Sequence, residues 1–376
     1  MKKKQVMAAW VPGICQKGGI QTFSKFLIDA ARFHLEEEIV VFSKSDFRRD
    51  LKKLFPHQNI YAFGFLPSVF RTLFWIFALF FWSLMHRPRL IYITHAHFAP
   101  VALILKKIVK QKYIVFVHGV EVWDLNKLWL KESLEHADLV LSVSEFTHGK
   151  IVEQGIKSEK IAIFPNTFDK DRFQVADKNK NIFLKYGVQE NEPVLLSVCR
   201  LVSSDLTKGY DLVLEALLLL RSKFPSLKYI IVGEGGDRTR IEERIRLLGL
   251  TDKVVLAGAV SDEDLGLYYQ NSDIFVLPSE REGFGIVFLE AIASGLPVIA
   301  ARCAGATEAL LHGELGDLIT PGSVLELSEK IEHRLSVGLT AEKNKKELRT
   351  KLIETFGFER FCRRLVKATD RVLSHE

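Results

Sequence analysis

The chain has 376 residues, of which 48% are apolar and 26% charged, and its formal net charge is +6. This balance excludes a disordered chain, and the length predicts two domains at roughly 150 residues each. Residues 1–170 contain 24 Lys and Arg against 15 Asp and Glu, which is +9. A basic half suits nucleic acid, an anionic membrane or a phosphorylated substrate, but without a helix-turn-helix, zinc-finger or RNP motif no nucleic-acid partner is expected.

The start of the chain, MKKKQVMAAWVPGIC, has basic residues before an apolar run, as a signal peptide does. Pro12 and Gly13 interrupt the run and Lys17 follows, so it is predicted to be a buried strand that ends in a glycine loop. The loop QKGGIQTFS then places Gly18 and Gly19 before an amphipathic helix. Such glycines let the backbone approach an anion at a helix N-terminus, although a plain tight turn accounts for them equally well.

The run LFWIFALFFW, residues 73–82, contains ten consecutive apolar residues, most of them aromatic. Extended to 72–85 it predicts a helix of 14 residues, about 21 Å long and too short for a hydrocarbon core of about 30 Å. Because it has no polar face, we expect either burial against the sheet and a neighbour or partial insertion into a membrane interface. Replacement of Trp75, Phe77 and Phe81 by Ser is expected to separate these alternatives.

Short runs rich in Val and Ile alternate with helical patterns along the whole chain, as in parallel strands that are buried on both faces. The predicted strands are QVMAAWV, EEIVVFS, LIYITHA, YIVFVHG, LVLSVS and IAIFPN, then PVLLSVC, KYIIVGE, KVVLAGAV, IFVLPS and PVIAA. They predict two doubly wound α/β domains with a boundary between 165–173 and 192–198. Ligands of such sheets bind beyond the carboxyl ends of the strands, so the residues that follow the strands are the candidates.

Three of these loops carry polar or glycine residues. His118 ends YIVFVHG and is either a structural hydrogen-bonding residue or a catalyst. In LLSVCRLVSSDLTKGY, Arg200 follows a strand and Lys208 precedes a helix, which suits a diphosphate, with surface ion pairs as the alternative. Gly233 and Gly235 of YIIVGEGGDR are interpreted as loop glycines near a ligand, because no GxGxxG is complete there.

The segment IFVLPSEREGFGIVFLEAIASGLPVIAA, residues 274–301, predicts a strand, a glycine loop and a helix from near Gly285 to Gly295. Glu282 and Glu290 are eight residues apart, which is about 12 Å if both are helical. A retaining glycosidase needs its carboxyl groups about 5 to 5.5 Å apart. We therefore expect the two residues to bracket a long ligand whose phosphates lie at the helix N-terminus.

The four cysteines, Cys15, Cys199, Cys303 and Cys362, form no CxxC pair and no Cys/His cluster. We expect buried free thiols in a reduced compartment, and no metal site.

Taken together, these motifs resemble those of the retaining GT-B glycosyltransferases of the family-four (group 1) type. The resemblance rests on EGFGIVFLE as a Glu-x7-Glu motif, the GG loop, the His-Gly loop, Arg followed by Lys-Gly, and PNTFD at the boundary. It implies an α/β GT-B fold with two Rossmann-like doubly wound domains facing a cleft. The expected parts are an acceptor-binding domain at 1–175, a nucleotide-sugar domain at 190–355 and a C-terminal helix, 356–376, that returns to the N-terminal domain.

For the donor, the resemblance implies that Glu282 and the backbone of Phe284 and Gly285 hold the transferred sugar. Arg200 and Lys208 would bind the diphosphate.

The resemblance also implies that Glu290 accepts hydrogen bonds from the ribose hydroxyls. Val260 would lie near the base, with Ile286 and Gly19 also on the donor side.

On the acceptor side, the resemblance implies Gly18 and Glu121, while His118 would contact the sugar near the reacting centre as a catalytic residue, like Glu282, Arg200 and Lys208. Asn166 and Glu308 are further candidates. The chain departs from the family pattern at Cys199 and Thr167, which stand where Gly is usual.

The implied activity is retaining, metal-independent transfer of a hexose from a nucleoside-diphosphate sugar, UDP-glucose before GDP-mannose, without a cofactor. The acceptor would be a glycan or a lipid-linked sugar in cell-surface polysaccharide synthesis. The expected location is the cytoplasm, with peripheral contact to the anionic inner face of the cytoplasmic membrane. A nucleotide-sugar epimerase of the same fold, and a non-catalytic nucleotide-binding or membrane-peripheral assembly protein, are the alternatives.

Overall fold

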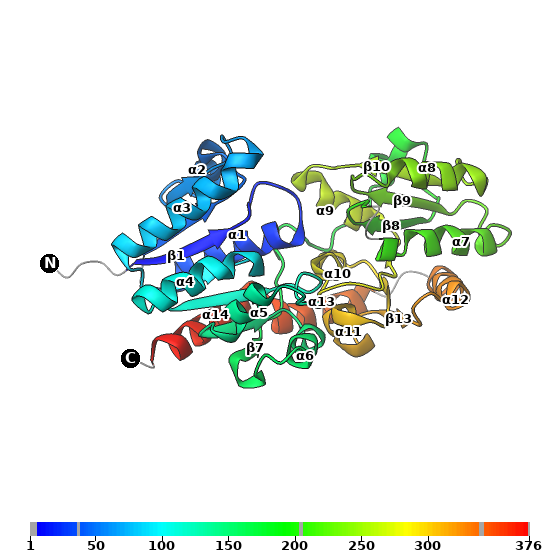
Figure 1. Ribbon diagram of the computed structural model, residues 1–376. Helices are drawn as coiled ribbons and strands as arrows, with labels where there is room; N and C mark the ends of the chain where they lie inside the picture. Colours follow the sequence, from blue (N-terminus) through cyan, green and yellow to red (C-terminus); the bar gives the residue numbers. More distant parts are fainter. Residues whose placement is uncertain (1–5, 36–37, 203–205, 338–341, 375–376) are drawn as a thin grey trace. The chain divides into compact units, whose positions relative to one another are not determined.

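The computed structural model describes residues 6–35, 38–202, 206–337 and 342–374. The chain forms two compact units, one of Met1–Thr167 with Phe358–Glu376 and one of Phe168–Gly357 (Figure 1). The division after Thr167 falls inside the PNTFD stretch.

The first unit contains a parallel seven-stranded sheet of order β3-β2-β1-β4-β5-β6-β7. Its strands are β1 (Val6–Val11), β2 (Glu38–Ser43), β3 (Asn59–Ala62), β4 (Ile91–Ile93), β5 (Tyr113–Val117), β6 (Leu139–Ser142) and β7 (Ile161–Ile163). The strand order reverses between β1 and β4, as in a doubly wound sheet.

Helices cover both faces of this sheet. They are α1 (Gly19–His34), α2 (Arg48–Leu54), α3 (Ser68–His86), α4 (Ala99–Val109), α5 (Leu128–Glu135), α6 (Glu145–Glu153) and α14 (Phe358–Leu373). Along β1, Met7 and Ala9 pack with residues of α1 and α14, while Ala8 and Trp10 pack with residues of α3 and α4. Burial on both faces explains why the strands are apolar without alternation.

The predicted C-terminal helix returns to the first unit, as expected. Helix α14 packs on α1, and its Phe361 ring lies 5.6 Å from that of Phe23. The hydroxyls of Tyr92 and Thr369 hydrogen-bond at 2.7 Å. Gly357 separates α13 from α14, and a Cβ at this position would lie 2.4 Å from the carbonyl oxygen of Ile353.

The second unit contains a parallel six-stranded sheet of order β10-β9-β8-β11-β12-β13. Its strands are β8 (Val194–Val198), β9 (Lys228–Val232), β10 (Val254–Gly258), β11 (Ile274–Leu277), β12 (Val298–Ala301) and β13 (Asp317–Ile319). Its helices are α7 (Tyr210–Leu220), α8 (Arg238–Leu247), α9 (Asp262–Asn271), α10 (Ile286–Ala293), α11 (Ala304–Ala309), α12 (Val324–Ser336) and α13 (Glu342–Phe356). Here the order reverses between β8 and β11, so the prediction of two doubly wound domains is confirmed.

Short 3-10 segments complete the units: η1 (Ala96–Phe98), η2 (Ser158–Lys160), η3 (Lys180–Tyr186), η4 (Leu206–Lys208) and η5 (Leu311–Gly313). Two strands, β3 and β13, were not predicted. Both lie at a sheet edge and have four and three residues, and β3 exposes Asn59 and Tyr61. They therefore lack the long apolar run that marked the inner strands.

The aromatic run forms α3, which has 19 residues rather than 14. At about 28 Å it is the one helix within the described ranges that is long and apolar enough, by length and composition, to cross a membrane; the prediction of a helix too short to span was wrong. A narrow stripe of Trp75, Leu79 and Ser83 is buried. Phe77 and Phe81 are exposed, so grouping Trp75 with them was also wrong.

The expectation of buried thiols holds for one cysteine. Cys362 is buried, Cys199 and Cys303 are half-buried, and Cys15 is exposed; none of these four described residues forms a disulfide. Cys15 lies in the exposed loop between β1 and α1. The wide spacing of the cysteines in the sequence therefore did not predict whether each one is buried.

We expect Trp75→Ala to lower the free energy of unfolding of the first unit by about 3–5 kcal/mol. The side chain is 1% exposed and its ring lies edge-on to that of Trp10 at 6.4 Å. Phe77→Ala, on the exposed face of the same helix, should change it by less than about 0.5 kcal/mol. Urea unfolding of both variants measures this, and equal losses would show that α3 does not pack as described.

Candidate functional site

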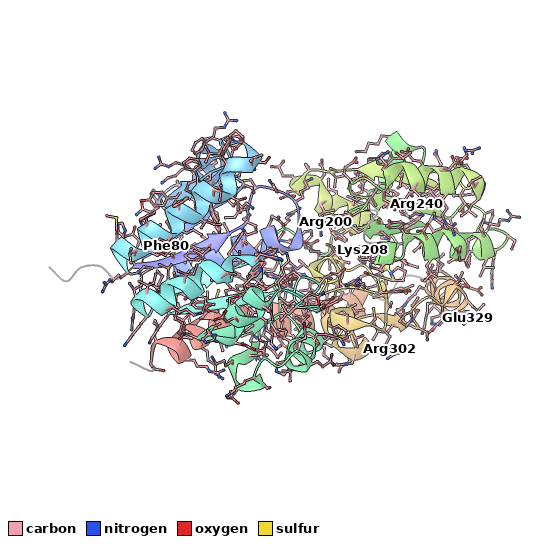
Figure 2. All side chains as sticks on the ribbon, in the orientation of Figure 1. Phe80, Arg200, Lys208, Arg240, Arg302 and Glu329 are labelled. Carbon is pink, nitrogen blue, oxygen red and sulfur yellow. The ribbon has the colours of Figure 1, made fainter. Side chains whose placement is uncertain are left out.

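The loops after β8 and β11 flank the point where the second sheet reverses its order. In open α/β sheets ligands bind at this point, beyond the carboxyl ends of the strands. Arg200 and Lys208 come from the β8–α7 connection (Figure 2), and Glu282 and Gly285 come from the β11–α10 connection. These four predicted site residues therefore lie in loops at the same edge of one sheet.

The loop that carries Arg200 is fixed by its neighbour after β9. The backbone N–H of Leu201 donates to the carbonyl of Glu234 at 3.0 Å. A Cβ at Gly233 would lie 1.8 Å from the carbonyl oxygen of Cys199, and one at Gly235 would lie 1.9 Å from that of Leu201. These glycines, predicted to be near a ligand, thus allow close packing of the loop that presents the exposed Arg200.

The β8–α7 loop is also pressed against the β11–α10 loop. The backbone N–H of Glu280 donates to the carbonyl of Thr207 at 2.8 Å. Gly209 has φ +80°, and a Cβ there would lie 2.4 Å from the carbonyl oxygen of Pro278. Only glycine suits this position, because it needs both a left-handed conformation and the missing side chain.

An ion pair joins the two loops next to this contact. The Nζ of Lys208 lies 2.9 Å from the Oε2 of Glu282, and the side chains are 14% and 18% exposed. Lys208 therefore does form an ion pair, as the alternative allows, but one that is largely withdrawn from water and joins the two sides of the strand-order reversal. Glu282 lies before α10, so the 12 Å separation expected for two helical residues does not apply.

Helix α11 packs against the glycine loop between Glu282 and α10. The N–H of Gly305 donates to the carbonyl of Glu282 at 3.0 Å, and a Cβ at Gly305 would lie 2.0 Å from the carbonyl oxygen of Gly283. Gly285, the N-cap of α10, has φ +90°. Phe284 is buried, with its ring edge-on to that of Phe356 at 5.4 Å, so the predicted sugar-binding backbone is rigidly supported.

Glu290 lies inside α10 and is buried. The hydroxyl of Tyr269 on α9 donates to its Oε2 at 2.9 Å. Burial raises the pKa of Glu290 to about 7, against the opposing effects of the Tyr269 hydrogen bond and the charge of Arg172. Tyr269 was missed by the sequence analysis, because nothing in its local sequence marks it as the partner of a residue 21 positions away.

Two apolar candidates lie at the same edge of the second unit. Val260 follows β10 and is half-buried, and Ile286 is the first residue of α10 and is buried. Glu308 lies on α11.

In the first unit, the loop between β1 and α1 carries the predicted glycines. Gly18 is the N-cap of α1 and Gly19 its first residue; among the described residues, no atom outside the chain neighbours and the backbone of α1 lies within 4 Å of a Cβ placed at Gly19. Asp46 holds this loop, since its carboxylate accepts the N–H groups of Ile14 at 2.7 Å and Cys15 at 3.1 Å. Asp46 was not predicted, because its backbone partners Ile14 and Cys15 lie 32 and 31 residues away in the sequence.

His118 follows β5 and is partly buried. Its Nε2 lies 2.9 Å from the carbonyl oxygen of Thr94, and its ring lies edge-on to Phe23 at 4.7 Å. Burial lowers its pKa to about 4. Because a carbonyl only accepts, we assign the proton to Nε2, which leaves Nδ1 of the neutral ring as an acceptor.

The other candidates of the first unit follow β5 and β7. The Oε1 of Glu121 accepts the N–H of His118 at 2.5 Å, so this carboxylate closes the turn after β5. Asn166 Oδ1 and Thr167 Oγ1 are buried and have no hydrogen-bond partner among the described residues.

Comparisons with known proteins identify the family to which the chain belongs. Residues 19–172 match the model of Glycosyltransferase Family 4, and residues 178–354 match that of Glycosyl transferases group 1. The chain belongs to the group 1, family-four glycosyltransferases, with the GT-B fold.

Among curated relatives, the GDP-mannose-dependent alpha-(1-6)-phosphatidylinositol monomannoside mannosyltransferase of Mycolicibacterium smegmatis is 30% identical over 236 residues, 59% of this chain and 61% of the relative. The mannosylfructose-phosphate synthase of Agrobacterium fabrum is 31% identical over 49% of this chain and 43% of the relative. The matches thus span from under half to about three fifths of these two relatives.

Among solved structures, HepE of Anabaena in complex with UDP has a TM-score of 0.80 at 22% identity, covering 97% of this chain and 99% of the other. A glycosyltransferase of Rickettsia africae has a TM-score of 0.81 at 22% identity, covering 99% of this chain and 100% of the other. These likenesses show the fold.

We expect Gly209→Ala to weaken nucleotide binding by at least tenfold. The new Cβ would strain a left-handed backbone and collide with Pro278, 2.4 Å away, which forces apart the loops that carry Lys208 and Glu282. Gly187→Ala is a matched control, because Gly187 has φ +73° and, apart from its chain neighbours, no atom of the described residues lies within 4 Å of the added Cβ. Calorimetric titration of UDP and GDP measures both, and an equal loss in the control would assign the effect to backbone strain alone.

The burial of Glu290 predicts a pH dependence of stability. Its pKa rises from 4.5 in the unfolded chain to about 7 in the folded one, so between these values the folded state binds more protons. Relative to Glu290→Gln, the unfolding free energy of the wild type should therefore fall as pH rises from about 4.5 to 7, by about 3 kcal/mol at most. Melting temperatures at pH 5 and 7.5 test this, and a pH-independent difference would contradict it.

Proposed function

We propose that this protein is a retaining glycosyltransferase that moves a hexose from a nucleoside-diphosphate sugar to a glycan or lipid-linked acceptor in cell-surface polysaccharide synthesis. The observation that carries the proposal is the Lys208–Glu282 pair, which joins the loops after β8 and β11. Family membership agrees with it.

The proposed chemistry follows from the charge that develops as the donor breaks. Departure of a nucleoside diphosphate places negative charge on its β-phosphate, and fixed cations together with a helix N-terminus stabilise that charge. Lys208 and Arg200 supply the cations, and α10, which has no acidic residue in its first turn, supplies the helix end. We propose that this arrangement replaces a metal ion and that no cofactor is needed.

The remaining donor contacts are proposed from the same edge of the sheet. Glu282 and the backbone of Phe284 and Gly285 hold the sugar. Glu290 is proposed to accept hydrogen bonds from the ribose hydroxyls. Both oxygens of an ionised carboxylate accept, so a donor bound in this way would lower the pKa of this buried group from its value of about 7.

Two apolar side chains and one glycine complete the proposed donor contacts. Val260 lies near the base, with Ile286 and Gly19 also on the donor side.

The proposed roles of the first unit concern the sugar and the acceptor. Nδ1 of the neutral His118 can accept a hydrogen bond from a sugar hydroxyl, because its Nε2 is engaged by Thr94. Gly18 and Glu121 are proposed on the acceptor side. Retention would follow from attack of the acceptor on the same face of the sugar that the phosphate leaves.

For the donor we propose UDP-glucose ahead of GDP-mannose. HepE, a protein with a similar fold, is described in complex with UDP-glucose, whereas the M. smegmatis relative is GDP-mannose-dependent. Ribose recognition by Glu290 does not separate these nucleotides. A thermal-shift titration with UDP, GDP and ADP would separate them. The nucleotide with the cognate base should raise the melting temperature most, because its base adds contacts near Val260.

For the acceptor we propose a glycan or a lipid-linked sugar, met in the cytoplasm at the inner face of the membrane. The name of the M. smegmatis relative includes a phosphatidylinositol glycolipid, which supports a lipid-linked acceptor.

We expect Arg200→Ala and Lys208→Ala each to lower turnover of a radiolabelled nucleotide sugar by about 10²–10³-fold, the usual effect of removing one group that stabilises developing charge. Arg221→Ala is the control, since Arg221 is an exposed cation at the end of α7 in the same unit.

Wild-type protein that binds nucleotide without turnover would favour the non-catalytic binding class. Conversion of the donor to its epimer without transfer would identify an epimerase.

A further inference from the structure

Helix α3 presents an uncharged apolar face to the outside of the first unit. Seven of its residues are 52–78% exposed: Val69, Phe70, Leu73, Phe74, Phe77, Phe81 and Met85. At 100° per residue they lie on the side opposite Trp75, Leu79 and Ser83, which pack on the sheet. We call these seven residues the α3 outer face.

The size of the α3 outer face sets it apart from ordinary surface hydrophobics. At roughly 200 Å² per large side chain, about half exposed, it offers roughly 700 Å² of apolar surface. A typical soluble monomer has a largest patch of about 300–600 Å². Phe80, labelled in Figure 2, packs against the core behind this face, with its ring 5.6 Å from that of Phe81.

The surrounding sequence has charge of one sign. Between Asp50 and Glu121 there is no acidic residue, and the interval contains nine Lys and Arg. Arg87, at the C-terminal end of α3, and Lys110, at the end of α4, are exposed. Helix α4 packs on α3 and exposes Ile104 and Ile108. An apolar face in a sequence interval whose only charged Lys, Arg, Asp or Glu residues are cations is complementary to the interface of an anionic bilayer.

The geometry excludes a helix that crosses this bilayer while the unit stays folded. Helix α3 connects β3 and β4, which lie in the same sheet. Its buried stripe belongs to the core, with Trp75 against Trp10. The half-buried Trp82 also packs inward, with its ring 5.1 Å from that of Phe42. The helix can therefore offer a bilayer only its outer face, lying along the surface.

We propose that the α3 outer face is a membrane-binding surface that inserts into the interface of an anionic bilayer, with Arg87 and Lys110 on the headgroups. This deepens the proposed function, because it rests on a lipid-linked acceptor being met at the membrane. A second copy of the chain is the less complementary occupant, since it would bring the same cation-only interval against this one.

The test is flotation of the full-length protein with vesicles of phosphatidylglycerol and phosphatidylcholine. Wild type should bind these vesicles at least tenfold more than pure phosphatidylcholine, and the combined Phe74→Ser, Phe77→Ser and Phe81→Ser variant should lose at least tenfold. The control replaces Leu219, Leu247 and Leu325 by Ser. These side chains are 55–71% exposed on the second unit, and the control should bind as wild type does.

Turnover of soluble nucleotide sugar is measured on the same variants, so that failure of the donor chemistry and failure of membrane binding are distinguished. If circular dichroism shows that the triple variant does not fold, two other variants are tested in its place. These are Phe77→Ser alone and the double variant Arg87→Glu, Lys110→Glu, and each should weaken vesicle binding. Absence of wild-type binding, equal loss in the leucine control, or self-association abolished by the same serines would overturn the proposal.

Discussion

The close approach of two loops across the strand-order reversal of the second sheet is the constraint on which the candidate site depends. The loops after β8 and β11 touch through backbone groups. They can approach this closely only because Gly209 has no side chain to collide with the backbone of Pro278. Once the loops meet, Lys208 and Glu282 form their ion pair with little exposure to water. A partly desolvated pair needs such support, since the desolvation of each charge opposes the attraction between them. The glycines and the charges of the motif are therefore one feature.

The strands that could be predicted from the sequence are those that are buried on both faces. Inner strands such as β1 and β5 are covered on both faces, so their apolar runs contain no polar residue and stand out from the helices. The edge strands β3 and β13 are short, and β3 alternates exposed and buried residues, so no run of this kind exists there. The length of an apolar run distinguishes a buried strand from a buried helix. A short edge strand has no continuous apolar run, so this criterion cannot identify it.

For the site, the sequence predicted residues that follow strands but not the residues that hold them. Gly285 and Lys208 were found because their position after a strand is a local property of the chain. Tyr269 and Asp46 act through contacts with segments 21 and 31 or 32 residues away, and no local pattern encodes such a partner. The burial of Glu290 was missed for the same reason, because helix α9 supplies its hydrogen-bond donor.

Helix α3 shows where a hydrophobic pattern is uninformative in principle. Periodicity identifies the inner face of a helix through contrast with a polar outer face, and here both faces are apolar. Length and composition therefore describe α3 as they would a transmembrane helix, although a stripe of three residues joins it to the core of the sheet. The distinguishing property is which strands the helix connects: because β3 and β4 belong to one sheet, the helix must remain on the surface of the unit, and its apolar outer face has to be explained by what lies against that surface.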